Sequence, residues 1–213
     1  MKTDDLIDAL SDRLEPTAPN AAWRRLTLWV TASVVVSAVI MLSWLGPRPD
    51  FMLATRTVMF WVKFFYTLAL GGLALWAAER LGRPGLAARR PMMGWIVVVG
   101  AAALIAGIEL ALAPAPMRRH MLMGHSAMLC PWRILALAIP LLIGALAALR
   151  TLAPTRPVLT GLAGGVAAGG LAAFVYAFSC NESAMPFVAL CYTLPMLAAG
   201  LIGAVAGRFA LRW

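Results

Sequence analysis

The chain has 213 residues, of which 62% are hydrophobic and only 13% are charged, and its formal net charge at pH 7 is +9. Soluble globular domains carry charges on roughly a quarter of their residues, so this composition excludes an ordinary water-soluble protein. We therefore expect an all-α, polytopic membrane protein that forms one helical bundle and has no second folded domain.

The first predicted element is a short amphipathic helix over residues 3–14. Thr3 is placed to act as its N-cap, and the aspartates that follow suit the positive end of the helix dipole. Because anionic lipid headgroups would repel so acidic a helix, we expect it to bind a basic protein partner that offers an apolar groove. The helix has an apolar stripe at helical spacing, formed by Leu6, Ile7, Leu10 and Leu14. Its acidic side is formed by Asp4, Asp5, Asp8 and Asp12.

A proline-containing tether separates this helix from the rest of the chain. Pro16 and Pro19 favour an extended backbone. We therefore divide the chain into residues 1–20, a cytoplasmic helix with its tether, and residues 21–213, a six-helix transmembrane domain. The start of the chain is acidic and no cleavage site follows a short apolar core, which indicates a retained first span and not a secretory signal.

Six apolar stretches follow the tether, each near the ~20 residues that a bilayer core requires. They run approximately over Leu26–Leu45, Thr57–Ala78, Gly94–Ala113, Arg133–Leu149, Val158–Phe178 and Phe187–Phe209. Glycines at four-residue spacing in the last two stretches predict close helix packing within the bundle. These glycines are Gly161, Gly165, Gly169, Gly203 and Gly207.

Lysine and arginine residues are unevenly divided between the two sides of these stretches. With the N-terminus inside, twelve of the 18 fall in cytoplasmic segments and five in outer segments, and Lys63 lies within a span. This asymmetry predicts a multi-pass protein of the bacterial inner membrane with both termini in the cytoplasm. The basic residues are spread over separate short segments, so direct nucleic-acid binding is the lesser interpretation.

The predicted outer side gathers the residues that best suit a sensing or metal-binding site. The connection between the third and fourth spans holds both histidines, His120 and His125, and ends near Cys130; Cys180 follows the fifth span and Cys191 lies in the sixth. Two of the cysteines could form a disulfide in an oxidising compartment. They could instead bind a soft metal ion together with the histidines, or act only as small apolar residues.

Two charges are predicted to lie within the membrane. Lys63 in the second span and Glu109 in the third lie at similar depth, near the outer ends of adjacent helices. We expect them to form a structural ion pair. The alternatives are a proton or ion path and a lysine that extends to the membrane surface.

The residues give little support to catalysis. The sequence has no Ser/His/Asp pattern, no phosphate-binding glycine loop, no pair of catalytic carboxylates and no CxxC motif. We therefore expect a protein that is not an enzyme and that needs no cofactor, with a soft metal ion as an alternative signal.

Several motifs, taken together, resemble the NrsF-type membrane anti-sigma factors of proteobacteria. They are the Asp-rich segment over residues 3–14, the tether, the six spans, Phe60-Trp61-Val62-Lys63, His125-Ser126 followed by Cys130-Pro131, and Cys180 with Glu182. The resemblance extends over essentially the whole chain. It implies a protein that holds an extracytoplasmic-function sigma factor at the inner membrane through its N-terminal segment and releases it under stress.

The resemblance also implies roles for individual residues. It implies redox or metal sensing at Cys130 and Cys180, whereas Cys191 has no counterpart in the family's pattern. The implied sigma-binding residues are Thr3, Asp4, Asp5, Leu6, Ile7 and Leu10.

Two other functions remain as alternatives. One is a small transporter or metal-handling protein that uses the Met/His/Cys-rich outer loop together with Lys63 and Glu109. The other is a structural scaffold for a membrane complex. The acidic N-terminal helix argues against transport, because a transporter has no evident use for it.

Overall fold

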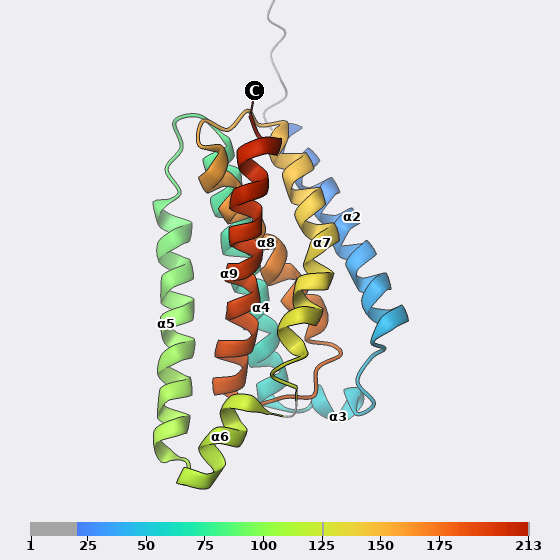
Figure 1. Cartoon of the computed structure of the whole chain (residues 1–213), viewed down its shortest axis with the longest axis vertical. Helices are drawn as coiled ribbons and strands as arrows, with labels where there is room; N and C mark the ends of the chain where they lie inside the picture. The colour runs from blue at the N-terminus through green and yellow to red at the C-terminus, as the bar shows by residue number, and fades with distance from the viewer. Residues whose placement is uncertain (1–20, 125, 213) are drawn as a thin grey trace, which may run out of the picture.

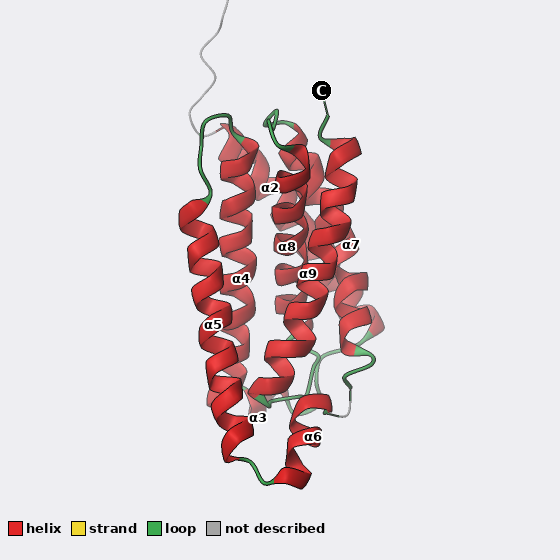
Figure 2. Cartoon of the chain, turned by 60° about the vertical axis from the view of Figure 1, so that its left-hand side comes forward, coloured by secondary structure: helices red, strands yellow, loops and turns green. Residues whose placement is uncertain are grey.

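Eight helices make up most of residues 21–124 and 126–212, which are the residues that the computed structural model describes (Figure 1). No strand occurs over these residues (Figure 2). The helices are α2 (Ala21–Trp44), α3 (Phe51–Ala54), α4 (Val58–Gly82), α5 (Arg89–Leu112), α6 (Ala115–Met123), α7 (Cys130–Arg150), α8 (Pro157–Tyr176) and α9 (Met185–Ala210).

Six of these helices, namely α2, α4, α5, α7, α8 and α9, are long and apolar enough to cross a membrane. This confirms the number of apolar helices predicted from the sequence. The largest differences in bounds are at the basic ends, where α2 begins at Ala21, α4 continues to Gly82 and α5 begins at Arg89. Hydropathy marks where side chains become polar, whereas helical hydrogen bonding continues for another turn. The predicted acidic helix over residues 3–14 lies outside the described residues.

Helix α8 lies at the centre of the bundle and α5 at its edge (Figure 1). The apolar stretch of α8 is 72% buried, whereas that of α5 is 11% buried. α8 packs against α9, α4, α7 and α2, whereas α5 packs against α4 and α9. The outward-facing side chains are largely apolar, and Leu28, Val97 and Leu201 are all more than half exposed.

Glycines allow α8 and α9 to approach closely. A Cβ atom added to Gly203 would lie 2.8 Å from Gly165 Cα, and one added to Gly207 would lie 2.9 Å from Gly161 Cα. Both distances are shorter than a normal van der Waals contact, so the backbones meet where side chains are missing. The predicted glycine steps therefore pack within the bundle.

The bundle has two chemically different ends. The end that holds the loops over residues 83–88 and 151–156, and also the C-terminus, is called here the arginine end. The opposite end holds the connections over residues 45–57, 113–129 and 177–184 and is called the cysteine end (Figure 2).

Two short helices at the cysteine end were not predicted. α3 is a single turn between α2 and α4, and α6 lies within the connection that the sequence analysis treated as a loop. Pro116 lies in the first turn of α6, where proline lacks only an N–H that has no helical partner. The mixed composition of this segment concealed the helix.

Candidate functional site

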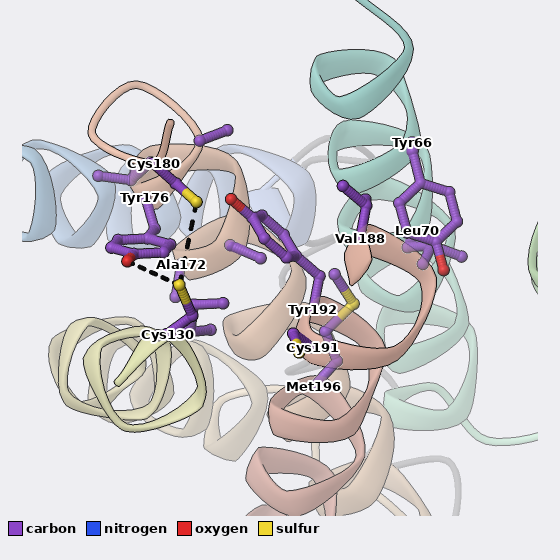
Figure 3. Packing of buried hydrophobic residues seen from close by; sticks show 14 of the residues in the cluster. Tyr66, Leu70, Cys130, Ala172, Tyr176, Cys180, Val188, Cys191, Tyr192 and Met196 are labelled. Carbon is purple, nitrogen blue, oxygen red and sulfur yellow. Dashed lines mark hydrogen bonds between the residues drawn. The ribbon is translucent and has the colours of Figure 1, made fainter. Parts of the chain in front are cut away.

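The cysteine end contains a pair of free thiols in contact. Cys130 is the first residue of α7, and Cys180 lies in the connection after α8 (Figure 3). Their Sγ atoms are 3.9 Å apart, and both residues are almost completely buried. A disulfide needs about 2.05 Å between the sulfurs, so a shift of less than one atomic diameter would join them.

Two hydroxyl groups hold the Cys130 sulfur in place. Its Sγ lies 3.0 Å from Tyr176 Oη and 3.1 Å from Ser126 Oγ. Each hydroxyl comes from the residue four positions before a cysteine, Ser126 before Cys130 and Tyr176 before Cys180. Sequence reasoning gave neither residue a role, although this one-turn spacing was a usable signal.

A buried lysine supports the connection that carries Cys180. Lys63 Nζ donates hydrogen bonds to the carbonyl oxygens of Cys180 (2.9 Å) and Glu182 (3.0 Å), and the residue is only 1% exposed. Arg48 Nη1 also donates to the Cys180 carbonyl at 3.5 Å, while its Nε and Nη2 pair with Asp50 at 2.7 Å each. Lys63 and Arg48 thus both donate to the carbonyl of Cys180. The backbone carbonyls of this connection replace part of the water that the two cations lose on burial.

This arrangement favours the thiolate form of Cys180. Its pKa is lowered to about 6, first because the Cys130 thiol donates a hydrogen bond to it and then because the Lys63 ammonium lies nearby; burial opposes both effects. Thiolates are the reactive form of cysteine toward oxidants and metals. The pair therefore combines a hydrogen-bonding thiol with an activated one.

The third cysteine lies apart from this pair. Cys191 belongs to α9 and is separated from the other two sulfurs in the view of Figure 3, in which the Tyr192 hydroxyl points toward Cys180. Among the described residues, Cys130 and Cys180 are the two cysteines whose thiols lie within hydrogen-bonding distance of each other. Cys191 is thus a buried member of the core and does not complete the pair.

The predicted ion pair between Lys63 and Glu109 is wrong. Lys63 binds the two carbonyls named above, and Glu109 Oε2 accepts a hydrogen bond from the backbone N–H of Met185 at 3.2 Å. Each side chain binds backbone of residues 180–185 and not the other side chain. Equal depth in adjacent helices did not decide which partner each charge would take.

The structure leaves the metal-binding prediction open. Among the described residues, no group of three or more His, Cys, Asp and Glu side chains could hold a metal ion. His125 lies outside the described residues, and His120 lies on α6. Nearby, Ser126 Oγ donates to Glu182 Oε1 at 3.3 Å, which joins the segment before α7 to the one before α9.

The predicted sigma-binding residues cannot be placed in this geometry. Thr3, Asp4, Asp5, Leu6, Ile7 and Leu10 all lie outside the described residues. What the structure provides is the helix that follows them, since α2 starts at Ala21 at the arginine end (Figure 1).

Comparison with known proteins identifies the family. Residues 10–213 match the NrsF family, described as negative regulator of sigma F. The chain is 45% identical over 218 residues to "Anti-sigma-F factor NrsF" of Caulobacter vibrioides (strain NA1000 / CB15N), and 35% identical over 214 residues to "Probable anti-sigma-F factor NrsF" of Azospira oryzae (strain ATCC BAA-33 / DSM 13638 / PS). Both alignments cover 100% of each chain, and no solved structure matches significantly. The family resemblance seen in the motifs is therefore confirmed, and the chain belongs to the NrsF family of negative regulators of sigma F.

Proposed function

We propose that this chain is a membrane-bound anti-sigma factor that holds an extracytoplasmic-function sigma factor and releases it when Cys130 and Cys180 react. The observation that carries the proposal is the contact of two buried free thiols at 3.9 Å, at the end of the bundle opposite to the start of α2. The names of the two relatives support the regulatory role. The protein thus acts by binding and release, without a catalytic step.

The surface of the bundle supports the proposed membrane insertion. Six helices are long and apolar enough to span a bilayer, and their exposed side chains are mostly Leu, Ile, Val and Met. An apolar surface this extensive needs lipid or protein to cover it. The excess of Lys and Arg in the segments of the arginine end favours a cytoplasmic location for that end and for both termini.

The N-terminal segment is the proposed binding element. Sigma factors bind DNA phosphates and RNA polymerase through basic, partly apolar surfaces. An acidic amphipathic helix competes for such a surface by charge and by filling its apolar groove. The residues assigned to this contact are Thr3, Asp4, Asp5, Leu6, Ile7 and Leu10.

The proposed signal is chemistry at the outer cysteines. In oxidation, the two thiols lose two protons and transfer two electrons to a two-electron oxidant, and one S–S bond forms between Cys130 and Cys180. A soft metal ion would instead displace the protons and bind both thiolates. Either reaction draws the first turn of α7 toward the connection over residues 177–184.

Helix α7 offers a physical route from this site to the N-terminal segment. It packs along α2, with the Ser37 hydroxyl donating to the Leu137 carbonyl at 3.1 Å and with Gly144 against Ser33 and Trp29. A displacement of α7 at Cys130 therefore alters the packing of α2, which leads directly into the proposed binding segment. The packing of α7 against α2 is therefore the feature that would couple the cysteine pair to the N-terminal segment.

The release experiment compares cysteine variants of the full-length protein in lipid nanodiscs, loaded with the sigma factor that co-purifies with it. A thiol oxidant should release the sigma factor from the native protein and from the matched control Cys191→Ser. It should release none from Cys130→Ser/Cys180→Ser, because no disulfide forms. Release from this double variant would overturn the sensing role, and disulfide formation without release would overturn the coupling.

The binding experiment uses charge reversal in the N-terminal segment. Asp4→Lys/Asp5→Lys should abolish co-purification of the sigma factor without reducing membrane insertion. The matched control Asp4→Glu/Asp5→Glu keeps both negative charges at the same positions and should retain binding. Equal binding by both double variants would contradict the proposal and shift weight to the transport alternative.

A further inference from the structure

An apolar groove opens between α4, α5 and α8 at the arginine end, far from the cysteine pair. Its volume is ≈ 840 Å³, and its walls include Leu73, Ala77, Ile96, Leu159 and Val166. A cavity of this size accommodates the chains of a lipid or a comparable apolar ligand. Cys130, Cys180 and Lys63 are not among the residues that line this groove.

Specific contacts fix the elements beside this groove. Arg80 Nε donates to the Ala87 carbonyl at 2.7 Å, which fixes the loop between α4 and α5. Thr160 Oγ1 donates to the Leu81 carbonyl at 3.1 Å, which fixes α8 against α4. The groove is therefore built by the fold and is not an accidental gap between loose helices.

The mouth of the groove is positively charged. Arg83, Arg89 and Arg156 line it, and its described lining includes no carboxylate. Arg83 Nη2 is paired with Glu79 at 2.6 Å, whereas Arg89 and Arg156 are exposed and leave two positive charges at the rim. An anion at this position would complete the charge balance.

Two residues that line the groove each carry a buried nitrogen without a hydrogen-bond acceptor. Arg83 Nε and Trp95 Nε1 have no partner among the described residues. Buried donors without acceptors are rare and costly in native proteins. Trp95 lies six residues into α5 from Arg89, about 9 Å deeper along the helix axis, so acceptors are missing at two depths.

We propose that this groove binds one anionic phospholipid of the surrounding leaflet. The phosphate lies among Arg83, Arg89 and Arg156, an ester carbonyl accepts from Trp95, and an acyl chain fills the apolar walls. A phospholipid places an anion, a neutral acceptor and a hydrocarbon chain in this order. The inference rests on the proposed membrane insertion and not on the sigma-factor assignment.

The test measures lipid binding to the full-length protein in detergent by native mass spectrometry, with phosphatidylglycerol and phosphatidylcholine of identical acyl chains. The native protein should prefer phosphatidylglycerol. Arg89→Gln/Arg156→Gln should weaken that binding about twenty-five-fold, the product of about fivefold for each arginine near an anionic group. The control Arg24→Gln/Arg25→Gln removes the same charge at the same end but outside the groove, and should bind as the native protein does.

Further arms separate the other occupants. Trp95→Phe should weaken both lipids severalfold, because the ester group is common to them, and it keeps the test available if the double variant does not fold. Free glycerol phosphate should not displace the lipid. Equal affinity for the two lipids, equal loss in both double variants, or displacement by glycerol phosphate would overturn the proposal. If Arg89→Gln/Arg156→Gln weakened sigma-factor capture but left lipid binding unchanged, the groove would be a protein-docking surface and the lipid proposal would be wrong.

Discussion

Lys63 is the buried charge around which the cysteine end is arranged. Its ammonium donates to two backbone carbonyls, which replace part of the water it loses on burial. The same charge lies near the Cys180 thiol. One side chain therefore positions the connection over residues 177–184 and also favours the thiolate that it carries.

Replacing Lys63 is expected to change the pH dependence of the cysteine pair. The pKa of Cys180 is lowered to about 6, so the rate of disulfide formation in the native protein should rise through pH 6 as the thiolate forms and level off above it. Lys63→Gln removes one of the causes of this lowering, so the rise moves to higher pH and the rate at pH 7 falls. Timed oxidation with diamide from about pH 5 to about pH 9, followed by mass spectrometry, measures the profile.

Lys63→Arg is the matched control, because it keeps the positive charge and the ability to donate to both carbonyls. Its profile should stay close to that of the native protein. A Lys63→Gln profile that coincides with the native one would show that the charge has no part in activating Cys180.

At the residue scale, the sequence was informative about which residues matter and less so about their partners. It singled out Cys130 and Cys180, which the fold brings into contact, and Lys63, which supports them. It paired Lys63 with Glu109 because charges within a membrane are costly unless matched. The actual partners are backbone carbonyls and an N–H, which any sequence would supply, so residue types could not reveal them.

Among the elements, the contact between α8 and α9 sets the tightest geometric demand. Gly165→Val should destabilise the bundle by about 1–3 kcal/mol, the usual cost of overpacking. A Cβ atom there would lie 2.8 Å from Gly200 Cα, so one helix must move. Thermal unfolding of the detergent-solubilised protein should show a lowered Tm.

Gly107→Val serves as the control for that substitution. It adds the same side chain on α5, where a Cβ atom would meet nothing within 4 Å. Its Tm should stay near that of the native protein. Equal losses at both sites would mean that helix propensity, and not the contact between α8 and α9, determines the effect.

The elements themselves were largely predictable. Six long apolar stretches have only one way to satisfy their backbone groups in lipid, as helices, and the structure contains all six. α6 was missed because a nine-residue helix with cationic and methionine side chains has no such constraint. The central position of α8 also followed from no single pattern, although its glycine and alanine content allowed it.

For the whole molecule, the central question is how two opposite ends communicate. α7 begins at Cys130 and runs for 21 residues, about 32 Å, along α2. Coupling between distant sites is typically about 1–3 kcal/mol. A packed pair of helices can carry that much only if displacement of one necessarily alters the other.

This requirement can be tested at Gly144, where α7 meets α2. A Cβ atom there would lie 3.0 Å from Ser33 Cβ, 3.1 Å from the Trp29 carbonyl oxygen, and in collision with Ser33 Oγ. Gly144→Val should therefore separate the two helices. Oxidation should still form the disulfide between Cys130 and Cys180, but the amount of sigma factor released per disulfide should fall several-fold, measured by parallel mass spectrometry and size-exclusion chromatography.

The control is Gly107→Val, on α5, which should release sigma factor as the native protein does. Ser37→Ala gives a milder loss of the contact between α7 and α2 if Gly144→Val does not fold. Equal release per disulfide in all of these proteins would remove α7 and α2 as the connection, because a contact that can be opened without effect transmits nothing.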